Sequence, residues 1–222
     1  MVNSIEYMLS GRPPITPSDK VHSMANRCYL SCSDHDGIYP SFSLPNFNTE
    51  VQWLVHGAGC LPLIWLPMFT DGDLVSKEFT AEGQTFTETA PVVSRMLGVE
   101  RLLSLRGFLN NLFRENGGLD HHIDMFAEYI KSVDGEFVTV ELQEISWLYQ
   151  AGEFQPLLRR CLTNMAAQSI EAKDALITLS TVIDGRRFLT LEDTEDGNYE
   201  DEDMWNYFRI MGEPYIRSVP WS

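Results

Sequence analysis

The stretch MLGVERLLSLRGFLNNL, residues 96–112, carries the clearest structural signal in the chain. Its apolar residues recur every three or four positions: Met96, Val99, Leu102, Leu105, Leu109 and Leu112. This spacing predicts a helix with one apolar face, and Asn116-Gly117-Gly118 follows as its stop. Asp120 is expected to cap a second helix, whose apolar face consists of Ile123, Phe126, Ala127 and Ile130. Asp134-Gly135 then turns the chain, so the centre of the sequence is predicted to be helical.

Toward the C-terminus, helical spacing returns over residues 157–165 and again over 175–183. The preceding residues, 138–149, fit two patterns. Val138, Val140 and Leu142 alternate as in a strand, whereas helical spacing connects Leu142, Ile145, Leu148 and Tyr149. The boundary between strand and helix stays open here. A short strand over 187–191 and an amphipathic helix over 204–211, ending near Gly212, complete this half of the prediction.

Toward the N-terminus, alternating apolar residues predict a strand over residues 27–33: Cys28, Leu30 and Cys32. A short helix capped by Thr49 is expected next, ending at Gly57, with an apolar face formed by Val51, Leu54 and Val55. Residues 60–66 are then a buried strand or a packed extended segment.

Strands near both ends of the chain with a helical middle predict a single α+β (mixed) domain over residues 24–222. With 222 residues, of which 44% are hydrophobic and 11% aromatic, the chain has enough apolar side chain for a sizeable core. Residues 1–23 hold a basic residue and three prolines in a polar setting, and we interpret them as a flexible N-terminal arm.

Charge and cysteine content restrict the function classes. The chain has 16 Lys and Arg against 32 Asp and Glu, a formal charge of −16, which disfavours nucleic acid and anionic membranes as partners and favours cationic ones. The 4 cysteines are too few for a disulfide framework, and we expect free thiols. No secretory signal opens the sequence, and the longest apolar stretch, residues 60–69, is too short to span a bilayer. The expected location is the cytoplasm.

Half of the net charge lies in a segment of twelve residues, 192–203, that contains no base. Its eight acids are Glu192, Asp193, Glu195, Asp196, Glu200, Asp201, Glu202 and Asp203. One interpretation is a solvated, solubilising loop. Another is a docking surface that attracts a basic partner by long-range steering. A calcium loop with Gly197 at the sixth position fits poorly, because that pattern begins with Asp and ends with Glu, whereas this segment does the reverse.

Candidate catalytic and metal-binding residues are weaker. Cys28, Cys32, His35, His56 and Cys60 resemble a zinc set in composition. In a strand, however, Cys28 and Cys32 would lie about 13 Å apart, so buried thiols are the better interpretation. His121 and His122, with Asp124 nearby, suggest a general base, but adjacent helical residues diverge by about 100°, which favours capping or surface roles. No nucleophile, phosphate-binding or dinucleotide motif is present. The sequence predicts no catalytic residues, no metal and no cofactor.

Aromatic residues follow the acidic segment directly, beginning with Trp205. Acids beside aromatics suit a basic protein face, because the rings supply buried area while the carboxylates pair with Lys and Arg. We therefore expect a partner-binding surface formed by the eight acids of residues 192–203 together with Trp205. A nuclease or another nucleic-acid-binding toxin would be a natural target.

Met24-Ala25-Asn26-Arg27-Cys28-Tyr29-Leu30 resembles the opening of a group of uncharacterised bacterial proteins that begin Met-Ala-Asn-Arg-x-Tyr-Leu. The resemblance implies that Met24 corresponds to their start and that residues 1–23 are an addition. The acidic profile without catalytic motifs is similar to that of bacterial toxin-immunity proteins. The expected function is an immunity or antitoxin-like protein, not an enzyme, that neutralises a basic, secreted antibacterial toxin. The alternatives are a cytoplasmic enzyme or small-ligand-binding domain, and an adaptor for another host protein.

Overall fold

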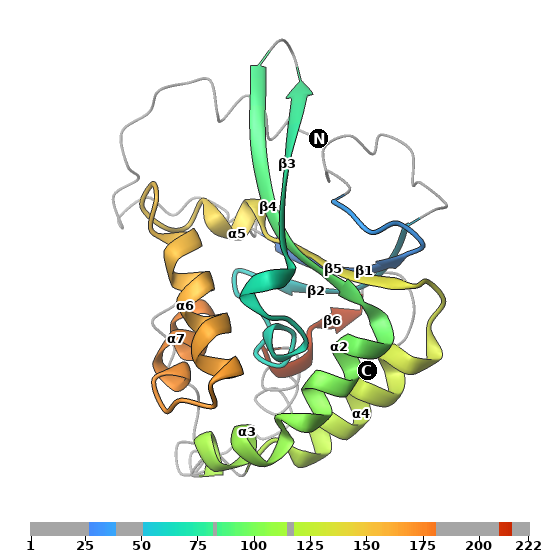
Figure 1. Ribbon diagram of the computed structural model, residues 1–222, viewed down its shortest axis with the longest axis vertical. Helices are drawn as coiled ribbons and strands as arrows, with labels where there is room; N and C mark the ends of the chain where they lie inside the picture. Colours follow the sequence, from blue (N-terminus) through green and yellow to red (C-terminus); the bar gives the residue numbers. More distant parts are fainter. Residues whose placement is uncertain (1–26, 39–50, 82–83, 115–117, 181–208, 215–222) are drawn as a thin grey trace, which may run out of the picture.

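The computed structural model describes residues 27–38, 51–81, 84–114, 118–180 and 209–214. Within these ranges the chain forms an antiparallel sheet of six strands in the order β3-β4-β5-β1-β2-β6 (Figure 1). The strands are β1 Arg27–Ser33, β2 Val51–Ala58, β3 Leu74–Ala81, β4 Gln84–Ser94, β5 Phe137–Glu141 and β6 Glu213–Pro214. The fold is mixed α+β with a single sheet, which confirms the predicted fold class.

Helices lie mainly against one side of this sheet. Those described are α2 Arg95–Ser104, α3 Arg106–Leu112, α4 Asp120–Ser132, α5 Gln143–Ser146, α6 Phe154–Ala166 and α7 Ala172–Ser180, with short 3-10 turns η2 Leu66–Met68 and η3 Asp71–Asp73. Figure 1 shows α2, α3, α4, α6 and α7 gathered on one side, while the β3–β4 hairpin projects on the other. One face of the sheet is therefore covered by these helices, and the opposite face is the second face.

Side-chain alternation along the strands defines these two faces. Leu30 pairs with Val140 and Cys32 with Val138, and all four side chains are buried in the main core with the helices. The residues that alternate with them along the strands, such as Tyr29 opposite Glu141, point to the second face. Strand pairing thus places the Glu141 carboxyl on the side of the sheet away from the main core.

Sequence-predicted helices are confirmed in four regions: 96–112, 123–130, 157–165 in α6, and 175–180 in α7, where the described residues of that prediction end. Residues 96–112 form α2 and α3, which break at Leu105, the residue that ends one helix and begins the next. The apolar face expected for residues 123–130 is buried in α4. Asp120 does not cap this helix, because its carboxylate binds Arg106 while Asn110 Oδ1 accepts the Leu119 N–H at 2.6 Å. The ambiguous residues 138–149 hold both elements, β5 followed by α5.

The short helix expected to end at Gly57 is wrong, because residues 51–58 form β2. Leu30 pairs with Val55 whereas Ser31 pairs with Trp53, so Leu54 is an extra residue in the ladder. Such a β-bulge lets two consecutive residues of one strand turn inward, which imitates helical spacing in the sequence. Leu54 and Val55 are indeed both buried.

Residues 61–69 are buried, as expected, but they form turns and η2 rather than a strand. The backbone N–H groups of Leu63 and Ile64 donate to the carbonyls of Arg209 and Ile210, and Trp65 Nε1 donates to Met211 O at 2.8 Å. Gly212 follows at φ +94°, where a Cβ would lie 2.6 Å from the Trp65 ring. Glycine is therefore required at this close approach.

Some expectations concern segments that lie wholly or mostly outside the described residues. The arm over 1–23, the strand over 187–191 and most of the helix over 204–211 lie outside the described residues; residues 209–211 are helical and Gly212 follows them. The strands of the β3–β4 hairpin, residues 74–94, were not anticipated, and β4 ends just before the stretch 96–112 that was predicted to be helical.

Candidate functional site

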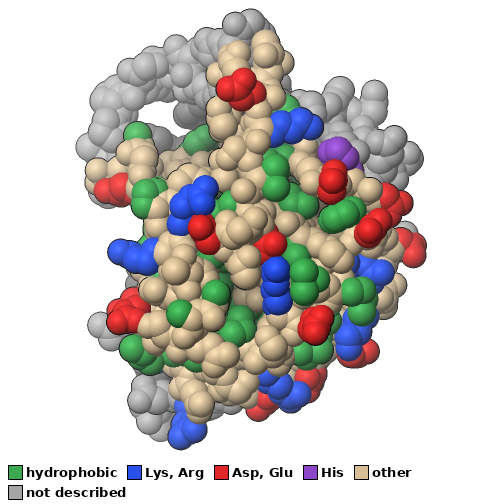
Figure 2. All heavy atoms as spheres, in the orientation of Figure 1, with side chains coloured by type: hydrophobic (Ala, Val, Ile, Leu, Met, Phe, Trp, Pro, Cys, Tyr) green, Lys and Arg blue, Asp and Glu red, His purple; other side chains and the backbone are tan. Residues whose placement is uncertain are grey.

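The acidic segment 192–203 and Trp205, which the sequence analysis predicts to bind a partner, lie outside the described residues. The structure therefore brings none of these nine residues to a described site. Figure 2 shows the charges on one face of the described surface, where Lys and Arg side chains are interspersed with Asp and Glu. Several of these bases are already paired, as in Arg101–Asp73 at 2.5 Å and Arg159–Asp71 at 2.7 Å.

The zinc-like set is not assembled into a metal site. Cys28 and Cys32 are buried free thiols on the core side of β1, as expected. Cys28 Sγ lies 3.3 Å from the Cys60 carbonyl oxygen, and burial raises the pKa of the Cys28 thiol well above its ordinary value. Among the described residues, no group of three or more His, Cys, Asp or Glu side chains is placed to hold a metal ion.

His121 and His122 lie in the first turn of α4, with ring centroids 6.0 Å apart. Burial, and then the neighbouring His121, lowers the pKa of His122 to about 4. Asp124, the carboxylate that might have oriented a histidine base, instead accepts a hydrogen bond from Arg106 Nη2 at 2.8 Å. His121 is exposed, as the surface interpretation expects, whereas His122 is partly buried.

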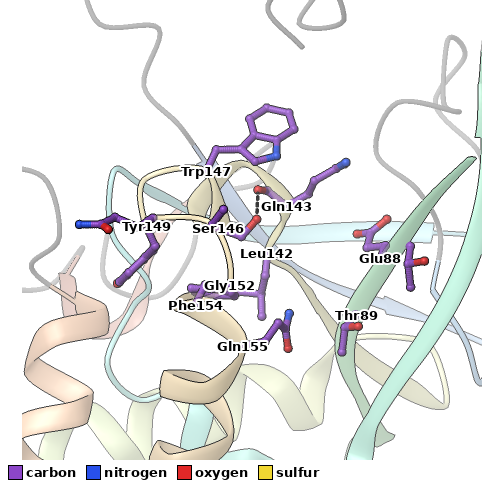
Figure 3. Close-up of a pocket in the computed structure, with 13 residues that line it drawn as sticks. Glu88, Thr89, Leu142, Gln143, Ser146, Trp147, Tyr149, Gly152, Phe154 and Gln155 are labelled. Atoms are coloured by element: carbon purple, nitrogen blue, oxygen red, sulfur yellow. Dashed lines mark hydrogen bonds between the residues drawn. The ribbon is translucent and has the colours of Figure 1, made fainter. Parts of the chain in front are cut away.

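A pocket of about 480 Å³ opens beside β4, in a part of the chain that sequence reasoning missed. β4 pairs with β3 over Gln84–Pro91 but with β5 only over Val92–Ser94, because β5 ends at Glu141 and the chain turns into α5. The pocket lies between this part of β4 and the α5–α6 region (Figure 3). Its volume falls within the range of about 300–1,000 Å³ that is typical of small-molecule sites.

Glu88 is the charged residue that lines this pocket. Its side chain is on β4 and only 5% exposed, and neither carboxyl oxygen has a hydrogen-bond partner among the described residues. Burial raises the pKa of Glu88 to about 7, because the ionised form loses hydration that nothing in its surroundings replaces. A buried carboxyl without a donor is unfavourable, so this residue requires an explanation beyond folding.

Glu141, the last residue of β5, directly precedes the pocket residues Leu142 and Gln143 and is a second buried carboxyl near Glu88. It is 2% exposed; its Oε1 accepts the Gln143 N–H at 2.8 Å, whereas its Oε2 has no hydrogen-bond partner. Burial, and then the nearby Glu88 carboxyl, raises the pKa of Glu141 to about 8. Both carboxyls hold protons near neutral pH, Glu88 because it is buried and Glu141 because it is buried near Glu88, and each can release its proton to solvent when a cation binds.

The remaining walls combine aromatic rings with polar groups. Figure 3 shows Glu88 and Thr89 on β4, Phe154 and Gln155 at the start of α6, and Trp147 at the rim. Gln155 Oε1 is buried without a hydrogen-bond partner, and Trp147 is 44% exposed. The pocket therefore presents unsatisfied acceptor oxygens beside an accessible ring, an arrangement suited to a ligand that donates hydrogen bonds and carries positive charge.

Sequence reasoning had a weak signal for this site. Residues 84–90, Gln-Thr-Phe-Thr-Glu-Thr-Ala, place threonine at every second position, which is typical of a strand with one polar face. The signal could have revealed β4. It could not have revealed that Glu88 is buried, because this depends on α5 and α6, more than fifty residues later in the chain.

No protein-family model, curated protein or solved structure matches this chain. In the part of the chain that the structure describes, no helix has both the length and the apolar character needed to cross a membrane.

Proposed function

We propose that this chain is a binding protein of the bacterial toxin-immunity type, which neutralises a basic cognate toxin by occluding its active site or substrate surface. The observation that carries the proposal is the concentration of acid: eight carboxylates in residues 192–203, followed by Trp205, in a chain of net charge −16. A local field of this kind accelerates encounter with a basic protein by about 10- to 1,000-fold.

The described surface supports this interpretation indirectly. Several bases are paired with acids: Arg106 contacts Asp120 and Asp124, and Lys131 Nζ is 2.7 Å from Glu128 Oε1. Charge on the face drawn in Figure 2 is mixed in sign. We therefore attribute steering to the acidic segment rather than to the folded surface, which predicts that neutralisation has different effects in the two places.

The test compares two variants with the same change in net charge. The first carries Glu200→Gln, Asp201→Asn, Glu202→Gln and Asp203→Asn; the control carries Gln at four exposed positions on the folded surface, Glu78, Glu100, Glu136 and Glu171. The partner is captured from a lysate on the wild-type chain, and association rates are measured between 50 and 500 mM salt. We expect the segment variant to associate at least tenfold more slowly at low salt and with a weaker salt dependence.

Growth assays decide whether binding is neutralisation. The captured protein is expressed alone and together with the wild-type chain, and only co-expression should restore growth. A captured protein that is harmless on its own would sink the immunity assignment. Equal rate losses in the segment variant and the surface control would refute the role of residues 192–203.

A second candidate function, a small-ligand-binding domain, is favoured by one observation, the pocket beside β4. Its volume would accommodate a small organic molecule, and its buried acceptors would select one with hydrogen-bond donors.

A further inference from the structure

Buried acceptor oxygens without partners gather in and behind the pocket beside β4. Both oxygens of Glu88, one oxygen of Glu141 and Oε1 of Gln155 are buried without a hydrogen-bond partner. Within the described residues, neither glutamate forms a salt bridge with Lys, Arg or His. A buried polar atom normally has a partner, and four unsatisfied acceptors in one region indicate that a donor comes from outside.

The nearest base on the neighbouring strand does not supply that donor. Lys77 stands opposite Glu88 in the β3–β4 ladder. Its Nζ instead lies 3.5 Å from the Ile38 carbonyl oxygen and 5.3 Å from the centre of the Phe79 ring. Lys77 is thus held by other groups, and the Glu88 carboxyl remains available to a ligand.

We propose that this pocket binds an organic cation, the ammonium or guanidinium group of a Lys or Arg side chain on the basic partner, with Glu88 as its counter-ion. The proposal rests on the proposed function, because it takes the partner's basic surface as the source of the side chain. The cationic group would donate to Glu88 and Gln155 while its aliphatic stem passes the exposed Trp147 ring at the rim. An ion pair in this buried location is charge-assisted and therefore stronger than one on the surface.

The lining favours an organic cation over a metal ion. Apart from Glu88, the pocket wall consists of Thr, Gln and Ser side chains, apolar groups and the rings of Trp147, Tyr149 and Phe154. Among described residues, no cluster of three possible metal ligands exists here or elsewhere. Aromatic rings and single acceptors stabilise a cation with a carbon stem, whereas Ca²⁺ needs six to eight oxygens.

Binding must release a proton when it occurs below neutral pH. The empty pocket holds Glu88 as a neutral carboxylic acid; the entering ammonium keeps its own proton, and the carboxyl O–H proton passes to solvent as the ion pair forms. Other titratable groups that face the pair are Glu141 on β5, Glu144 on α5, Tyr149 beyond α5 and Lys77 on β3. Burial and the Glu88 carboxyl raise the pKa of Glu141 to about 8, so its loss of a proton as pH rises strengthens the attraction for a cation.

The direct test uses side-chain mimics and the full chain. Nα-acetyl-lysine amide and Nα-acetyl-arginine amide are titrated by calorimetry at pH 6 and pH 8, with Nα-acetyl-norleucine amide as the uncharged control. We expect saturable binding of at least one cationic mimic, tighter at pH 8 by at least threefold, with proton release at pH 6 that is visible as a dependence on buffer ionisation enthalpy. Norleucine amide should not bind.

Two glutamine variants locate the site. Glu88→Gln keeps the shape of the side chain and removes its charge, and we expect at least a tenfold loss of affinity for the cationic mimics. Glu153→Gln makes the same charge change on an exposed residue beside the pocket and should bind as the wild type does. Absence of saturable binding by the wild type, or equal binding by Glu88→Gln, would overturn the proposal.

The partner complex tests the source of the cation. We expect Glu88→Gln to dissociate faster from the basic partner by at least tenfold, with little change in the association rate. If the variant binds the mimics weakly but forms the partner complex with wild-type affinity, the assignment to a protein side chain is refuted, and a free amine becomes the ligand. In that outcome, neutralisation by the acidic segment still stands, so the two proposals fail separately.

Discussion

Replacing Glu88 with glutamine should change the pH dependence of folding stability in a calculable way. The pKa of Glu88 is raised from 4.5 to about 7 in the folded state, so the folded chain holds a proton that the unfolded chain releases. Wild-type stability therefore falls as pH rises from 4.5 to 7 and is level above that. Each pKa unit corresponds to about 1.4 kcal/mol, which gives a loss of about 2–3 kcal/mol between pH 5 and pH 8.

Glutamine cannot ionise, so Glu88→Gln should lack this loss of folding stability between pH 5 and pH 8. The assay is urea unfolding of the wild type and the variant at pH 5, 6, 7 and 8. The variant should gain at least about 2–3 kcal/mol relative to the wild type across this range, because Glu141 titrates in both proteins and, without the Glu88 charge nearby, has a pKa that is raised less in the variant. Glu153→Gln, at an exposed site, should show no such gain. Parallel pH curves for the wild type and Glu88→Gln would contradict the buried, unpartnered state of this carboxyl.

Two further predictions concern the packing around the site. Trp65→Phe removes the Nε1 hydrogen bond to Met211 O and part of a fully buried ring, so urea unfolding should show a loss of about 2–4 kcal/mol; a loss under 1 kcal/mol would show that the ring is not held as described. Asn110→Ala removes the acceptor for the Leu119 N–H at the start of α4 and should cost about 1 kcal/mol by the same measurement, whereas Asn111→Ala, on the neighbouring exposed position, should cost less.

The spacing of apolar residues in the sequence was sufficient to predict helices that bury one face. The face of Ile123, Phe126, Ala127 and Ile130 is buried in α4 as the spacing predicts. The same reasoning failed for β2, because the bulge at Leu54 depends on the pairing of β2 with β1, some twenty residues away. A period in the sequence cannot reveal an irregularity that only the neighbouring strand imposes.

The candidate pocket was beyond sequence reasoning for a related reason. Glu88 follows Thr87 in a polar strand, where a glutamate is ordinarily solvent-exposed. Its burial arises because the chain leaves β5 at Glu141 and folds α5 and α6 beside β4. The predicted partner surface, residues 192–203 and Trp205, remains a prediction that the binding experiment tests.

The contacts of residues 61–69 set an order in which burial can occur during synthesis. β4, β5, α5 and α6 are all made by residue 166, so the walls of the pocket can form early. Trp65 is made much earlier but cannot form its hydrogen bond until Met211 is made. β2 likewise cannot pair with β6 until residues 213–214 are made. Until residues 211–214 are made, Trp65 Nε1 therefore lacks its acceptor and β2 has an unpaired edge. An unpaired strand edge can pair with another chain, so we expect this interval to be the one in which association occurs most easily.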